Sequence, residues 1–247
     1  MWLWADYRLL DDDRAVSIKV SDKRPEVHMS KKRAAVVVGY HTYDVCALQE
    51  MFEGFEDLHC YVQHLEQFTS STEDIRDSYD AVIFYTMEHR TPDENRPWYE
   101  GNVKEAMDHL GESGQGIVVL HHSLLAFENW PAWKQMTGLD PALYHDYRLD
   151  VPQRYHIVSD KHPVTKGMSD FEMTDEIYLC DRIMPVPGME ILVTSVDDVN
   201  MNAIAWTKSY RNSRVFCLQP GHGPSSYQNQ SFRNLLHRGI LWSMNCL

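Results

Sequence analysis

The stretch Ala34-Ala35-Val36-Val37-Val38-Gly39-Tyr40-His41 decides the fold class of this chain. Its first five residues are small or β-branched and lack polar alternation, which is typical of a strand buried on both faces of a parallel sheet. Asp44 follows as a candidate helix N-cap, and apolar residues then recur at helical spacing from Val45 to Phe55. The stretch therefore predicts a strand that leads directly into a helix.

The same alternation continues through the first half of the chain. The apolar pattern predicts further strands over 58–65, 80–86 and 117–120, with helices over 71–78 and 103–110. Gly111, Gly114 and Gly116 precede a strand instead of joining a strand to the next helix, so they indicate a turn and not a dinucleotide-binding loop. This order is typical of an α/β protein with an open, mainly parallel, flavodoxin-like sheet flanked by helices.

The second half of the chain predicts additions to this sheet. Extended segments are expected near 148–158, 171–178 and 191–195, a late antiparallel hairpin over 203–207 and 215–219, and a closing helix over 232–244. Residues 1–30 show no sustained period. We therefore expect an N-terminal extension over 1–30, followed by a single α/β domain over 31–247.

Composition excludes several classes of protein. The formal net charge of -13 argues against a general nucleic-acid binder. No apolar run approaches the roughly 18 residues of a spanning helix, so we expect no membrane partner. The five cysteines include no C-x-x-C pair, which argues against a disulfide framework and against a zinc ribbon. A cytoplasmic protein is expected.

Histidines follow the predicted strands. The chain has 13, and those at strand exits are His41, His89, His121 with His122, and His222. A single loop histidine is ordinarily exposed or hydrogen-bonded, but the carboxyl ends of parallel strands meet at one sheet edge, where ligands bind. We therefore predict a histidine cluster there. Imidazole serves both proton transfer and ligation of zinc, manganese or iron, and the sequence leaves both open.

Other polar and aromatic side chains are candidates for the same edge. Asp175, Glu176 and Tyr178 end an extended segment and can supply acid/base groups or bind hydroxyls. The alternative for them is an edge strand with solvated acids. Trp206 is suited to stacking on a sugar, with a place in the core as the alternative.

A covalent serine or cysteine mechanism is not expected. The best strand-to-helix elbow is Val119-Leu120-His121-His122-Ser123, and its tip is histidine. No G-x-S-x-G surrounds Ser123, and none of the five cysteines lies at an elbow.

Six segments together resemble the ThuA-like family, named for trehalose utilisation, from about Lys32 to Asn245. The matching segments are Gly39-Tyr40-His41, Gly116-Ile-Val-Val-Leu-His121, His162-Pro163-Val-Thr-Lys-Gly167, Asp175-Glu176-Ile-Tyr178, Ala205-Trp206 with Arg214-Val-Phe216 and Gly221-His222, and Gly239-Ile-Leu-Trp242. The resemblance implies a class I glutamine amidotransferase-like, flavodoxin-type fold that lacks the nucleophilic cysteine. It also implies a role in carbohydrate catabolism, with His122 where the cysteine would stand.

The leading hypothesis is therefore an enzyme, not an amidotransferase, that acts on a sugar or keto-sugar. His121, His222, Glu176 and Tyr178 are its predicted catalytic residues, and His121 and His222 are also candidate ligands of a divalent metal, zinc or manganese. The predicted substrate-binding residues are His41, His122, Asp175 and Trp206.

Several alternatives stay open at this stage. Proton abstraction next to a carbonyl predicts isomerisation or elimination, whereas a metal-activated water predicts hydrolysis. A non-catalytic sugar-binding or regulatory module is the rival from another class. The expected partner is a small-molecule sugar, and the oligomeric state is open, with a homo-oligomer among the alternatives.

Overall fold

The first strand forms as the sequence predicts. In the computed structural model, which describes residues 31–247 apart from 94–96, 98, 100 and 199, β1 spans Lys32–Gly39 and is buried from Ala34 onward. Helix α1 follows over Val45–Glu53, and the Asp44 side chain accepts a hydrogen bond from the Ala47 backbone N–H. The predicted N-cap is therefore confirmed.

The remaining elements complete one nine-stranded sheet. In chain order they are β2 Leu58–His64, α2 Leu65–Ser70, α3 Glu73–Asp77, β3 Ala81–Thr86, α4 Val103–Asp108, β4 Gly116–Leu120, a 3-10 turn His121–Leu125, α5 Pro131–Thr137, a 3-10 turn Pro141–Leu143, β5 Tyr144–Ile157, β6 Phe171–Cys180, β7 Glu190–Ser195, β8 Ala203–Tyr210, β9 Ser213–Leu218, α6 Pro224–Tyr227 and α7 Gln230–Ser243. The strand order is β2-β1-β3-β4-β9-β8-β7-β5-β6.

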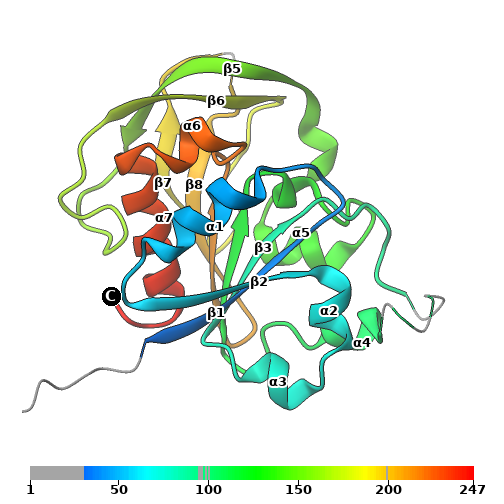
Figure 1. The fold of residues 1–247 in the computed structure, drawn as a ribbon. Coiled ribbons are helices and arrows are strands. Elements are labelled where there is room, and N and C mark those ends of the chain that lie inside the picture. The colour runs from blue at the N-terminus through cyan, green and yellow to red at the C-terminus, as the bar shows by residue number, and fades with distance from the viewer. Residues whose placement is uncertain (1–30, 94–96, 98, 100, 199) are drawn as a thin grey trace, which may run out of the picture. The chain divides into compact units, whose positions relative to one another are not determined.

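The sheet is parallel in one half and antiparallel in the other. Strands β2, β1, β3, β4 and β9 pair in parallel, and β9, β8, β7, β5 and β6 pair antiparallel. The α/β class and the late hairpin are confirmed. The antiparallel half is larger than the hairpin alone, because the long β5 and β6 pair with each other and extend it (Figure 1).

Helices cover both faces of the parallel half. Helix α6 contacts both α1 and α7 on one face, and α2, α4 and α5 lie on the other (Figure 1). Because two helical layers exclude water from it, β3 is buried at every residue. Residues Lys31–Leu247 form one compact unit. The predicted extension over 1–30 lies outside the described residues.

The predicted and observed helix boundaries differ in the segment that contains α2 and α3. The helix expected over 71–78 forms as the shorter α3, and α2 is a further helix that was not predicted. The two helices are separated at Ser71, whose backbone is extended (ψ 153°). None of the helices in the described ranges is long and apolar enough to cross a lipid bilayer.

Candidate functional site

The strand exits of β1 and β4 are sharp turns held in a strained backbone conformation. Tyr40, directly after β1, has φ 61°, and His121, directly after β4, has φ 54°. Non-glycine residues rarely adopt positive φ, and such residues gather at functional sites. The resemblance placed His122 at the nucleophile position, but the strained residue of this elbow is His121.

Four of the predicted histidines meet at this edge. The ring centroids of His121 and His222 lie 5.4 Å apart, those of His121 and His122 5.3 Å, and those of His41 and His122 4.5 Å. His89 does not join them, because its side chain is 55% exposed and faces Glu128 at 4.0 Å. The predicted convergence therefore holds for β1, β4 and β9 but not for β3.

Glu176 completes the centre of the cluster. One of its carboxylate oxygens lies 2.9 Å from His222 Nδ1, and the other lies 3.8 Å from His121 Nε2. His121 Nε2 and His222 Nδ1 are 3.3 Å apart. The three residues offer ligand atoms that all lie within 4.8 Å of one another, so one proton or one metal ion can be shared among them.

The tautomer of His121 follows from its other nitrogen. His121 Nδ1 lies 2.7 Å from the Gln219 carbonyl oxygen, which only accepts, so Nδ1 carries the proton and Nε2 carries the lone pair. Burial lowers the pKa of His121 to about 4, against the opposing effect of Glu176. The ring is therefore neutral at pH 7, with its lone pair directed at Glu176 and His222.

The pKa of His222 is shifted in the opposite direction to that of His121. Its hydrogen bond to Glu176 raises the pKa of His222, and burial only partly opposes this. One buried carboxylate thus holds a proton on one histidine while the other histidine stays neutral. Pairs of titratable groups whose pKa values are shifted in opposite directions are typical of acid/base sites.

Asp175 has a different role from the predicted one. Its carboxylate accepts hydrogen bonds from the backbone N–H groups of Gly221 (2.6 Å), His222 (3.1 Å) and Glu176 (2.8 Å). Gly221 has φ 132°, a conformation that side chains disfavour, which lets this turn bend onto the carboxylate. Asp175 therefore positions His222 and Glu176, and its oxygens are already engaged instead of facing a substrate.

Tyr178 packs against His121. The two rings are stacked with centroids 5.4 Å apart, and the Tyr178 hydroxyl is nearly equidistant from His121 Nδ1 (3.4 Å) and Nε2 (3.5 Å). Equal distances place the hydroxyl over the ring face and not along a lone pair. Burial raises the pKa of Tyr178 well above its ordinary value, so the phenol is neutral.

Trp206 does not reach the cluster. It is fully buried, and its indole N–H donates a hydrogen bond to the Thr137 carbonyl oxygen at 2.7 Å. A side chain enclosed in this way offers no ring face to a sugar, so the predicted stacking role is wrong and the core alternative holds.

Two residues of the site were missed at the sequence level. Gln219 orients His121 through its carbonyl oxygen, and its side-chain amide donates to the Glu176 carbonyl oxygen at 2.9 Å. Tyr85 packs on His122 with ring centroids 4.3 Å apart. Gln219 lies in the strand exit that precedes His222, which was a usable signal, whereas Tyr85 is one aromatic residue in an apolar strand.

His122 is the least satisfied polar side chain of the site. It is 2% exposed, and neither ring nitrogen has a hydrogen-bond partner in the described structure. Burial and the neighbouring histidines lower the pKa of His122 to about 2, so its ring is neutral with one donor and one acceptor nitrogen. Buried unpaired groups are unfavourable, which points to a functional reason for this residue.

This burial predicts an acid-sensitive fold. The unfolded chain, in which histidine titrates near 6.5, binds more protons below that pH than the folded chain, so the free energy of unfolding falls as the pH falls. Between pH 7 and pH 4.5, His122 accounts for a loss of about 2–3 kcal/mol. In urea unfolding of the chelator-treated protein, His122→Phe is expected to lose correspondingly less stability over this interval. An identical pH dependence of the two proteins would contradict this account.

Comparison with known proteins agrees with this architecture. The sequence matches the family described as ThuA, trehalose utilisation, over residues 33–243. The chain belongs to the ThuA family. No curated protein matches the sequence.

Solved structures show the same fold. A putative ThuA-like protein from Parabacteroides merdae ATCC 43184 is 16% identical with TM-score 0.67, over 87% of this chain and 90% of that one. The cytoplasmic protein STM3548 from Salmonella typhimurium is 12% identical with TM-score 0.58, over 85% and 98%. PurLQS from Thermotoga maritima is 14% identical with TM-score 0.54, over 85% and 98%. The fold of this chain is therefore glutamine amidotransferase-like.

Proposed function

We propose that this ThuA family member is an enzyme of carbohydrate metabolism that acts on a sugar or keto-sugar. The observation that carries the proposal is the convergence of His121 Nε2, Glu176 and His222 Nδ1 within 4.8 Å of one another. The strained backbone of His121 and the opposite pKa shifts of the two histidines support catalysis over simple binding. The family's description as trehalose utilisation supports a sugar as the substrate.

The arrangement supports proton abstraction from a carbon next to a carbonyl group. His121 Nε2, the neutral lone pair of the cluster, accepts the proton as the C–H bond breaks. The electron pair moves toward the carbonyl oxygen, and His222, held protonated by Glu176 at 2.9 Å, supplies a proton to that oxygen. Glu176, 3.8 Å from His121 Nε2, stabilises the imidazolium that forms. The resulting enediol leads to isomerisation or elimination.

The same three residues also form a suitable donor set for a divalent metal. Zinc and manganese accept two imidazole nitrogens with one carboxylate, and the hydrogen bond from His121 Nδ1 to Gln219 is the outer-shell contact that fixes a ligand histidine. A bound metal would stabilise negative charge on the substrate oxygen. Elemental analysis of the purified protein beside His121→Ala and His222→Ala decides between the metal-dependent and metal-free forms of the proposal.

Turnover of a keto-sugar tests the proposal. With 3-keto-glucose and 3-keto-trehalose as substrates, we expect His121→Ala and His222→Ala each to lower product formation by roughly a thousandfold, because each removes a proton-transfer group. His145→Ala, which removes an exposed histidine paired with Asp181 at 3.0 Å, is the matched control and should keep wild-type activity. Sugar binding without turnover in the wild type would favour a binding module instead.

A further inference from the structure

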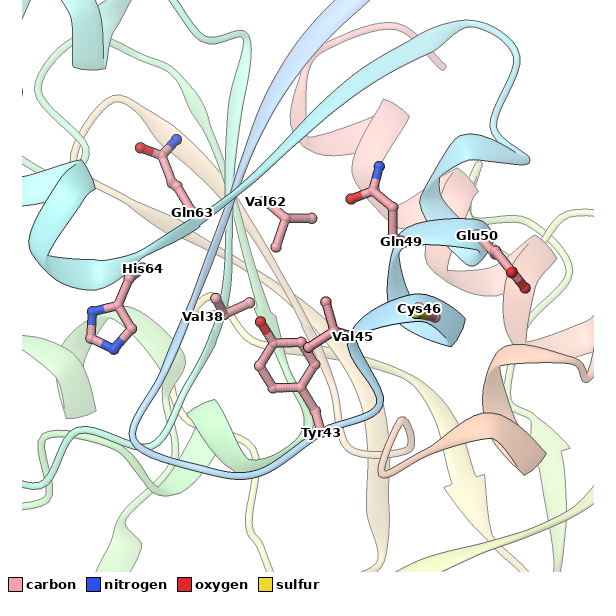
Figure 2. Close-up of a pocket in the computed structure, with 9 residues that line it drawn as sticks. All are labelled: Val38, Tyr43, Val45, Cys46, Gln49, Glu50, Val62, Gln63 and His64. Carbon is pink, nitrogen blue, oxygen red and sulfur yellow. The ribbon is translucent and has the colours of Figure 1, made fainter.

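A cavity of about 620 Å³ between α1 and β2 does not belong to the histidine and glutamate cluster. Figure 2 shows the side chains that line it around Tyr43, and none of them, among the described residues, is a member of the cluster. The buried ring of Tyr85 lies between Tyr43 and His122, with centroid distances of 5.9 Å and 4.3 Å. The strand that borders the cluster is instead β5, because it pairs with the part of β6 that carries Glu176.

The first residue of β5 lies beside the cluster. The ring of Tyr144 meets the ring of Tyr178 edge-to-face, with centroids 5.7 Å apart. Burial raises the pKa of Tyr144, and the negative charge of Glu176 raises it further. The start of β5 is therefore close enough to the cluster to feel the charge of its carboxylate.

A β-bulge in β5 lies directly opposite Glu176. Strands β5 and β6 run side by side (Figure 1), and they pair at Arg148 with Ile177 and again at Val151 with Asp175. Two residues of β5 lie between these pairs, whereas Glu176 alone lies between them on β6. A bulge of this kind re-aims a side chain, and bulges are frequent beside active sites.

Asp150, the second residue of this bulge, has a strained backbone and an unengaged carboxylate. Its φ is 54°, a conformation that few residues other than glycine adopt, although aspartate and asparagine tolerate it better than most. Its side chain is exposed, and no hydrogen-bond or ion-pair partner of the carboxylate occurs within the described part of the chain. Asp175, in contrast, already accepts three backbone hydrogen bonds.

The charge of Asp150 reaches His222. The hydrogen bond to Glu176 is the main cause that raises the pKa of His222, and the negative charges of Glu176, Asp175 and Asp150 contribute as well. Exposed charges more than about 10 Å apart are largely screened, so a carboxylate that acts on this ring lies near it. The bulge thus places Asp150 near the histidine that supplies a proton in the proposed chemistry.

We propose that Asp150 binds the substrate, with its carboxylate accepting hydrogen bonds from two neighbouring hydroxyl groups of a sugar held at the cluster. This inference rests on the proposed function and adds a specificity-determining residue to the same site. A carboxylate has two acceptor oxygens, and hydrogen bonds to a charged acceptor are stronger than those between neutral groups. The strained bulge serves to hold these oxygens beside the cluster.

Calorimetric titration of 3-keto-glucose into His121→Ala, which does not consume the sugar, tests this inference. Adding Asp150→Asn is expected to raise the Kd about tenfold, because asparagine tolerates the positive φ but lacks the charge. Adding Asp150→Gly, which relieves the backbone strain, should weaken binding at least as much while urea unfolding shows a folded protein. Asp146→Asn removes an exposed carboxylate from the same strand and is the matched control, with unchanged affinity.

Initial rates separate this inference from the proposed function. In the otherwise wild-type protein, Asp150→Asn should raise KM about tenfold and leave kcat within about threefold, because the contact is made equally in the ground state and the transition state. Unchanged Kd in both Asp150 variants, equal weakening by Asp146→Asn, or no binding of 3-keto-glucose would each overturn the inference. Binding that depends on Asp150 in a wild type without turnover would support the inference and reject the proposed function.

Discussion

Glu176→Gln is expected to lower keto-sugar turnover at least roughly a hundredfold while the protein stays folded. The carboxylate lies 2.9 Å from His222 Nδ1 and 3.8 Å from His121 Nε2. The neutral amide removes the negative charge that keeps His222 protonated. The same charge stabilises the imidazolium that forms when His121 accepts a proton. In a metal-dependent enzyme the same change removes a ligand. Initial rates with 3-keto-glucose measure the effect.

Glu172→Gln is the matched control for this experiment. Glu172 is exposed on the same strand, β6, so its substitution changes the net charge equally. We expect wild-type rates from it. If Glu176→Gln were as active as Glu172→Gln, Glu176 would have no part in the chemistry.

Asp175→Ala is expected to have the largest effect on stability, about 3–5 kcal/mol of lost free energy of unfolding. The substitution leaves three backbone N–H groups without their acceptor, and each buried unpaired donor costs about 1–3 kcal/mol. These donors belong to Gly221, His222 and Glu176, so the turn that carries His222 also loses its anchor. Urea unfolding measures the loss.

Asp175→Asn separates charge from hydrogen bonding at this position. The amide keeps one acceptor oxygen and should lose less stability than alanine does. Burial raises the pKa of Asp175, and the backbone N–H groups oppose that rise. A stable Asp175→Ala protein with unchanged unfolding would show that the turn does not depend on this carboxylate.

The parallel half of the fold was predictable because its strands are continuously apolar. Runs such as Ala34–Val38 and 117–120 are buried on both faces, so their signal needs no knowledge of the rest of the chain. The sequence pattern of β5 predicts a strand less clearly. Most of its first ten residues are exposed, and its pairing with β6 contains a register shift between Arg148 and Val151. Its place in the sheet depends on pairing with β6, which is a long-range contact.

The histidine cluster was predictable from topology, but the division of roles within it was not. In a parallel sheet the carboxyl ends of the strands meet at one edge, and this rule places His41, His121 and His222 close together. That rule fails for His89, which follows β3 but faces Glu128 at the surface. It also says nothing of side-chain hydrogen bonds, so Asp175 was assigned to substrate binding although its carboxylate accepts hydrogen bonds from the backbone N–H groups of Gly221, His222 and Glu176.

Deuterium incorporation tests the central claim most directly. When 3-keto-glucose is incubated with the protein in D₂O and followed by proton NMR, proton abstraction by the cluster replaces hydrogen on the carbon next to the carbonyl. We predict exchange well above the buffer rate with the wild type and exchange at the buffer rate with His121→Ala. Exchange at the buffer rate with both proteins, or equal enzymatic exchange in both, would contradict the claim that His121, Glu176 and His222 form a proton-transfer site.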